Sequence, residues 1–210
     1  MDKPQTVAMP DVAIPYDAVL RRLGYPPEVY EITGKAGQIL SEETERARRL
    51  IRPAGVFQLL EIQSNDKRAV TFHTSDFVIT SSQVARMLHD ANRAAFFAAT
   101  IGPKLEERVS SLSNDGEATR AVILDAIGSE TADAVADRLH RTVLSILAEE
   151  AQCRVTPRFS PGYGDWPLTA QSDLIDLCGG VSIGISVTPS SLMIPRKSIS
   201  AIAGWIPSPP

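Results

Sequence analysis

Residues 117–151 read EATRAVILDAIGSETADAVADRLHRTVLSILAEEA, the longest run of helical periodicity in the chain. The apolar stripe of this run consists of Ile123, Ile127, Val135, Leu139, Val143 and either Ile146 or Leu147. Apolar residues at this spacing are typical of an amphipathic helix that buries one face. We therefore expect one long helix, from about 117 to 151, as the scaffold of the fold. Gly128 within it costs about 1 kcal/mol relative to Ala, which indicates a kink or a close crossing with another backbone.

Shorter helices and strands are predicted on both sides of this run. Helical patterns with capping or stop signals occupy residues 15–23, 41–52, 82–91, 104–112 and 165–177. Runs typical of strands occupy residues 12–14, 56–62, 70–73, 94–101, 186–191 and 197–203. Thr80 and Gln83 have the spacing of a capping box at the start of the third helix. Residues 94–101 are apolar throughout, so this strand is expected to be buried on both faces of a sheet.

The order of these elements predicts the fold class. Helices and strands alternate irregularly, without the even rhythm of βαβ units, so we expect an α+β fold. It should be a single domain in which helices flank an antiparallel or mixed β-sheet. The domain is predicted to span residues 15–206, with an N-terminal arm at residues 1–14 and a tail at residues 207–210 that continues no element.

Composition restricts the class of function. The net charge of −4 leaves no basic surplus to neutralise phosphates, so nucleic acid is not expected as a partner. No run approaches the ~18 apolar residues of a membrane span, and no apolar core of a signal peptide follows Met1, so we expect no membrane association and a cytoplasmic location. Cys153 and Cys178 form no CxxC pair, which suits a reducing compartment and excludes a zinc ribbon and a three-cysteine iron–sulfur motif.

The sequence RFSPGYGDWP at residues 158–167 concentrates glycine, proline, aromatic residues and arginine. Its Pro-Gly pair predicts a tight turn, and the next glycine supplies a second flexible joint. Such a loop can bring its backbone close to a ligand, Tyr163 and Trp166 offer stacking faces, and Arg158 carries a fork that fits a carboxylate. The pattern indicates either a small-molecule site or a proline-rich connection with both aromatic rings in the core.

Two motifs resemble one known family. The first is Arg-x-x-Pro-Gly-Tyr at residues 158–163, and the second is VTPSSLMIPRKSIS at residues 187–200. Both, in this order, resemble the activation domain of cobalamin-dependent methionine synthase, the domain that binds S-adenosylmethionine (AdoMet). Residues 96–106 also resemble the strand and helix that precede the family's long helix. The sequence ADRL at residues 136–139 is similar to the family's Ala-Asp-Arg-Leu on that helix, which runs near the corrin.

The resemblance implies a ligand and a set of contacts. Arg158 is expected to hold the methionine carboxylate of AdoMet. The backbone of Ser160, Gly162 and Tyr163 is expected to contact its remaining polar edges, with the Tyr163 ring also packing against a ring of the ligand. Asp137 is expected to face a partner protein. No catalytic acid or base is expected, because the sulfonium of AdoMet is already an activated leaving group. No glycine-rich nucleotide loop opens a helix, so the fold that holds AdoMet is not expected to be a Rossmann fold.

The resemblance also implies reductive reactivation of cobalamin. An electron donor such as flavodoxin would reduce the oxidised cobalamin, which would then take a methyl group from AdoMet. None of His73, His89 and His140 lies in the Asp-x-His-x-x-Gly pattern by which corrinoid proteins ligate cobalt. We therefore expect the cobalamin to be carried by a partner, either a methionine synthase module or another corrinoid protein. The chain would then be a free-standing version of one part of the enzyme, with no metal of its own.

Ala203 departs from the family pattern, because long family members have a tyrosine at this strand position and continue past residue 210. Two other interpretations therefore stay open. The chain could be an adaptor that caps the corrinoid protein of another methyltransferase without binding AdoMet. It could also be an unrelated soluble α+β binding module whose Pro-Gly turn is purely structural.

Overall fold

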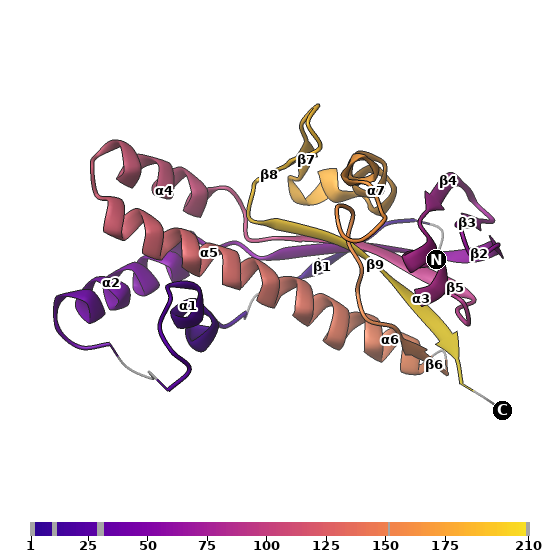
Figure 1. The fold of residues 1–210 in the computed structure, drawn as a ribbon, viewed down its shortest axis with the longest axis horizontal. Helices are drawn as coiled ribbons and strands as arrows, with labels where there is room; N and C mark the ends of the chain where they lie inside the picture. The colour runs from indigo at the N-terminus through magenta and orange to yellow at the C-terminus, as the bar shows by residue number, and fades with distance from the viewer. Residues whose placement is uncertain (1–2, 10–11, 29–31, 151, 209–210) are drawn as a thin grey trace.

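One seven-stranded sheet dominates the computed structural model, which describes residues 3–9, 12–28, 32–150 and 152–208 (Figure 1). The strand order is β4-β3-β2-β5-β9-β6, and β1 also pairs with β2. The bounds are β1 Gln5–Ala8, β2 Ala54–Asn65, β3 Ala69–Phe72, β4 Ser75–Thr80, β5 Arg93–Thr100, β6 Cys153–Val155 and β9 Ser198–Pro207. A separate hairpin consists of β7 Ser186–Val187 and β8 Met193–Ile194. All these pairings are antiparallel, so the sheet is antiparallel rather than mixed.

Helices cover both faces of the sheet. Their bounds are α1 Tyr16–Arg22, α2 Gly34–Leu50, α3 Ser82–Met87, α4 Lys104–Asn114, α5 Ala118–Arg138, α6 Ser145–Glu150 and α7 Gln171–Cys178. The helices α1, α2, α4, α5 and α6 contribute to one apolar cluster, whereas α3 and α7 contribute to a second cluster on the opposite face. The α+β class predicted from the sequence is therefore confirmed. No helix of the described residues is both long and apolar enough to cross a membrane.

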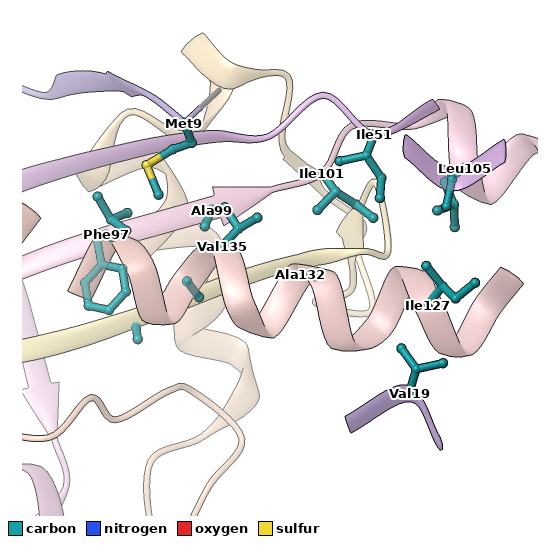
Figure 2. Close-up of a cluster of buried hydrophobic side chains, with 14 of the residues drawn as sticks. Met9, Val19, Ile51, Phe97, Ala99, Ile101, Leu105, Ile127, Ala132 and Val135 are labelled. Atoms are coloured by element: carbon teal, nitrogen blue, oxygen red, sulfur yellow. The ribbon is translucent and has the colours of Figure 1, made fainter. Parts of the chain in front are cut away.

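The strand β5 is buried on both faces, as its uninterrupted apolar sequence predicts. Phe96 belongs to the cluster beneath α3 and α7, and its neighbour Phe97 belongs to the cluster beneath α5. Figure 2 shows Phe97 and Ala99 pointing toward α5, which carries Val135 on the facing side. Successive side chains of a strand point to opposite faces, so this one strand contributes to both layers of the core.

The long helix forms where it was expected, but it is not uniform. The helix α5 passes into a π-helical stretch, Leu139–Leu144, and then into α6. Residue 151 and the side chains of Val143 and Ile146 lie outside the described part. A Cβ at Gly128 would lie 2.5 Å from Cδ2 of Leu105, so α4 packs directly against the backbone of α5. The close approach at Gly128 is therefore to a leucine side chain of α4 and not, as predicted, to another backbone.

Several predicted boundaries are wrong. The helix α2 begins at Gly34 rather than near Ser41, α3 ends at Met87 rather than near Ala91, residues 12–14 form no strand, β7 ends at Val187, and β9 continues to Pro207. Leu40 is buried in the core. This packing extends α2 into a segment that contains two weak helix formers, Gly34 and Gly37. Pro207 is tolerated because it is the last residue of its strand, where a missing N–H disrupts little.

Candidate functional site

The loop at residues 158–166 leaves β6, runs beside β9 and turns toward α7 (Figure 1). The backbone N–H of Phe159 donates to the carbonyl of Ile202 at 2.9 Å, and the N–H of Ile202 donates back at 2.8 Å. Trp166 is only 2% exposed, and its ring centroid lies 6.4 Å from that of Phe159. Tyr163, by contrast, is 69% exposed. Trp166 is therefore a core residue, whereas the ring of Tyr163 is exposed to solvent.

The Pro-Gly turn is present, and it is closed by its own hydrogen bonds. Gly162 has φ +87° and Gly164 has φ +54°, both in the left-handed region that favours glycine. The amide of Gly162 donates to the carbonyl of Trp166 at 2.8 Å, and the amide of Tyr163 donates to the carbonyl of Ser160 at 3.3 Å. Among the described residues, the Ser160 amide and the Gly162 carbonyl have no hydrogen-bond partner. These two groups are free to meet a ligand.

Asp165 ties the far end of the loop to α3. Its carboxylate accepts hydrogen bonds from the amide and hydroxyl of Ser82 at 2.7 and 2.5 Å, from the amide of Gln83 at 3.3 Å, and from the hydroxyl of Ser81. The Ser81 and Ser82 hydroxyls, followed by the two amides, hold the pKa of Asp165 well below its usual range. The loop is thus fixed to an element on the face of the sheet opposite α5.

Two predictions at this junction are wrong. Ser81, not Thr80, is the N-cap of α3, because its hydroxyl accepts the Val84 amide at 3.0 Å. Asp165 does not start the next helix, since a 3-10 turn at Leu168–Ala170 intervenes before α7 begins. Asp165 is therefore a residue of the candidate site that sequence reasoning assigned to another role.

Arg158 connects the loop to the middle of the long helix. Its Nη2 lies 3.0 Å from Oδ1 of Asp133, and its Nε lies 3.2 Å from Oδ1 of Asp137. The two carboxylates are one helical turn apart on α5, and both side chains remain almost half exposed. Among the described residues, no hydrogen bond or ion pair involves Nη1 of Arg158, so this nitrogen at the outer edge of the guanidinium keeps its hydrogens available. Asp137, predicted to face a partner, is thus brought to Arg158.

Thr156 holds the chain two residues before Arg158. Its amide donates to the carbonyl of Gly204 at 2.9 Å, and the Gly204 amide donates to its hydroxyl at 2.8 Å. Nε2 of His140 lies 2.8 Å from the Thr156 carbonyl, which can only accept, so this nitrogen carries the hydrogen. The His140 ring also stacks on Phe97, with centroids 6.0 Å apart. The π-helical stretch thereby helps to set the start of the loop.

The geometry can now be compared with known proteins. Residues 30–208 match the family model described as vitamin B12 dependent methionine synthase, activation domain. The chain belongs to this family. The solved structures that it resembles include one titled "Crystal Structure of the MetH Reactivation Domain bound to AdoHcy", with a TM-score of 0.73. The sequence identity is 16%, and the match covers 99% of this chain and 79% of that chain. The family resemblance drawn from the sequence is confirmed, and the structural likeness shows a shared fold.

The second motif of this activation domain spans the hairpin and the start of β9. The Thr188 hydroxyl accepts the Leu192 amide at 3.0 Å, which closes the hairpin turn. Ser200 lies in β9, where its hydroxyl accepts a buried hydrogen bond from Gln171 of α7 at 2.8 Å. Ile202, which pairs with Phe159, follows two residues later. Through β9, the structure therefore brings the second motif next to the loop that carries the first.

Ala203 of this activation domain is fully buried. It lies opposite Ala95 of β5 and belongs to the apolar cluster beneath α5. A tyrosine at this position would have to enter the layer between β9 and the long helix. The alanine therefore changes the core between β9 and α5 rather than the exposed surface of the loop.

Two of the three histidines and Cys178 of the activation domain take no part in this loop. Within the described ranges, no group of three or more His, Cys, Asp or Glu residues could hold a metal ion. His73 is exposed, and His89 lies 2.8 Å from Asp90 at the surface. Burial raises the pKa of the Cys178 thiol to about 12, which makes this cysteine a core residue without nucleophilic character.

Proposed function

We propose that this chain binds AdoMet at the loop of residues 158–166 and presents its methyl group to the cobalamin of a methionine synthase. The observation that carries the proposal is the open guanidinium edge of Arg158, beside exposed polar backbone, in a member of the activation-domain family. A carboxylate binds such an edge with two parallel hydrogen bonds. The AdoHcy named in the related structure supports the same ligand class, since AdoHcy is AdoMet without its methyl group.

The described residues fit the parts of AdoMet. Arg158 receives the methionine carboxylate through Nη1 and Nη2. Ser160 offers its free amide, and Gly162 offers its free carbonyl, to the other polar edges of the ligand. Tyr163 exposes a ring on which an adenine can stack. The amides of Gly162 and Tyr163 stay within the turn, so these two residues act through the carbonyl and the ring.

The role of the protein in this proposal is positioning. Bound AdoMet supplies a methyl group on an activated sulfonium, so the chain needs to supply no acid or base. It holds the methionine end of the ligand, keeps water away from the sulfonium and aligns the methyl group with a cobalamin that a partner carries. In this proposal the partner is a cobalamin-binding methionine synthase module on a separate chain, with flavodoxin or a similar protein as the electron donor.

Titration calorimetry with AdoMet tests the proposal. Arg158→Ala removes a charge-assisted contact worth about 1.5–3 kcal/mol, so the affinity for AdoMet should fall by roughly tenfold to a hundredfold. Arg154→Ala is the matched control, because this exposed arginine lies on β6 four residues away. An Arg154→Ala variant that loses as much affinity, or an Arg158→Ala variant that loses none, would remove Arg158 from the site.

An adaptor that caps a corrinoid protein without binding AdoMet is the second candidate. It is favoured by the closed turn, in which the Gly162 and Tyr163 amides already have partners, and by the buried Ala203 in place of the family tyrosine. The two candidates differ in a simple binding experiment. A cobalamin protein captured by this chain, with no heat of AdoMet binding to either the chain or the complex, would favour the adaptor. Binding of neither would overturn both candidates, and the family match over residues 30–208 already excludes the third interpretation, an unrelated α+β binding module.

A further inference from the structure

The ion-pair cluster around Arg158 has an unequal charge balance. One guanidinium faces two carboxylates, from Asp133 and Asp137, at 3.0 and 3.2 Å. A second cation, Arg141, lies at the edge of this cluster, with its Nη2 4.0 Å from Oδ2 of Asp137. The Arg141 side chain is 78% exposed, so water screens its charge strongly. In the cluster formed by Arg158, Asp133 and Asp137, two carboxylates therefore share one well-held cation.

The two carboxylates occupy only one side of the guanidinium. They lie beside Nε and Nη2, whereas Nη1 takes part in no hydrogen bond or ion pair of the described residues and is available to a ligand carboxylate. A ligand bound at the outer edge would therefore not need to displace either aspartate. Both aspartates are almost half exposed, so they remain open to further charged groups in the same site.

AdoMet and AdoHcy differ in charge at one atom. Both carry a carboxylate and an ammonium group, but AdoMet also carries a positive sulfonium where AdoHcy has a neutral thioether. One cation and two anions in the protein complement one anion and two cations in AdoMet. The neutral thioether of AdoHcy leaves one carboxylate of the protein without a counter-charge. This difference is independent of the carboxylate contact, which the two ligands share.

We propose that Asp133 and Asp137 are specificity-determining residues that make the site prefer the cationic sulfonium ligand to its neutral thioether product. The inference rests on the proposed binding of AdoMet at Arg158 and adds a role for two carboxylates of α5. The preference helps turnover, because the ligand loses its favourable interaction with the aspartates at the moment when its methyl group leaves. The thioether then dissociates more readily than the sulfonium.

The test compares the affinities of AdoMet and AdoHcy by titration calorimetry for wild type, Asp133→Asn and Asp137→Asn. Removing one half-exposed charge should weaken AdoMet by about three- to tenfold relative to AdoHcy. Asp125→Asn is the matched control, because Asp125 lies two turns earlier on α5 and pairs with Lys197 at 2.7 Å. Arg158→Ala should weaken both ligands equally, since both carry the carboxylate. Raising the salt from about 0.05 M to about 0.5 M should reduce the wild-type preference.

The outcomes distinguish a failure of the proposed AdoMet binding from a failure of the proposed preference for the sulfonium. A wild-type protein that binds neither ligand would overturn the proposed function and this inference together. A wild-type protein that binds both ligands, with Asn variants that weaken both by the same factor, would leave AdoMet binding intact and overturn only the inference. The aspartates would then act on the ligand solely by holding Arg158. Thermal unfolding of each variant checks that the fold is retained.

Discussion

Thr156→Val is expected to lower the free energy of unfolding by about 1–3 kcal/mol. Thr156 is 7% exposed, and its hydroxyl oxygen lies 2.8 Å from the amide nitrogen of Gly204 in β9. Valine keeps the branched shape but cannot accept a hydrogen bond, so the Gly204 amide would be buried without a partner. The stability lost is therefore the desolvation cost of this backbone N–H, together with the hydrogen bond that the Thr156 hydroxyl donates to the Pro157 carbonyl at 3.0 Å.

The size of the effect makes it measurable by thermal unfolding. A domain of this length loses about 2–4 °C of midpoint per kcal/mol, so a central value of ~2 kcal/mol predicts a decrease of roughly 4–8 °C. Thr156→Ser is the control, because it keeps the oxygen. It removes only the methyl carbon Cγ2, which should cost about 0.8 kcal/mol. Urea unfolding at fixed temperature gives the free energies directly.

The relative stability of the valine and serine variants tests whether the Gly204 amide needs an acceptor. The serine variant must be more stable than the valine variant, although it has lost a methyl group from a buried side chain. A valine variant as stable as wild type would mean that the Gly204 amide needs no acceptor. The hydrogen bond from the Gly204 amide to the Thr156 hydroxyl would then contribute nothing to holding the chain before Arg158.

Two further predictions concern the elements that flank the site. Gly128→Val should lower the free energy of unfolding by about 1–3 kcal/mol in urea, because its Cβ would lie 2.5 Å from Cδ2 of Leu105; wild-type stability would show that α4 can move away. Asp165→Asn should lower the melting temperature at neutral pH. The pKa of Asp165 is lower in the folded than in the unfolded protein, so its stabilising effect is fully present above the unfolded pKa of about 3.9 and is lost as the pH falls further. The difference in melting temperature should therefore narrow below about pH 4, and a constant difference across that range would refute the role of the charge.

Periodicity predicted the elements whose apolar pattern repeats within a few residues of sequence. The stripe through Ile127 and Val135 identified the long helix, and the apolar run of β5 identified the buried central strand. The start of α2 could not be found in the same way. Its first turn contains Gly34 and Gly37, which are weak helix formers, and the turn is helical because Leu40 packs into the core. Local propensity contains no information on such packing.

The partners of the site residues were missed for a different reason. Arg158 and Asp133 are 25 residues apart, and Asp165 and Ser82 are 83 residues apart. The motif at residues 158–163 indicated which residues to consider, but a motif does not state what each side chain contacts. One signal was present, because Asp133 and Asp137 lie four residues apart and must share a helix face. That spacing places two carboxylates on one face of the helix, but it does not indicate that an arginine from the loop would pair with them.

The contacts at the two ends of the loop have a consequence for binding. Arg158 attaches the loop to α5, Phe159 attaches it to β9, and Asp165 attaches it to α3. The segment between these contacts, including the turn at Gly162, is closed by its own hydrogen bonds before any ligand arrives. A ligand therefore meets a surface whose backbone is already ordered, and little conformational entropy is lost when it binds. Differences in affinity between related ligands should then follow the charges at Arg158 and its two aspartates rather than the closing of the loop.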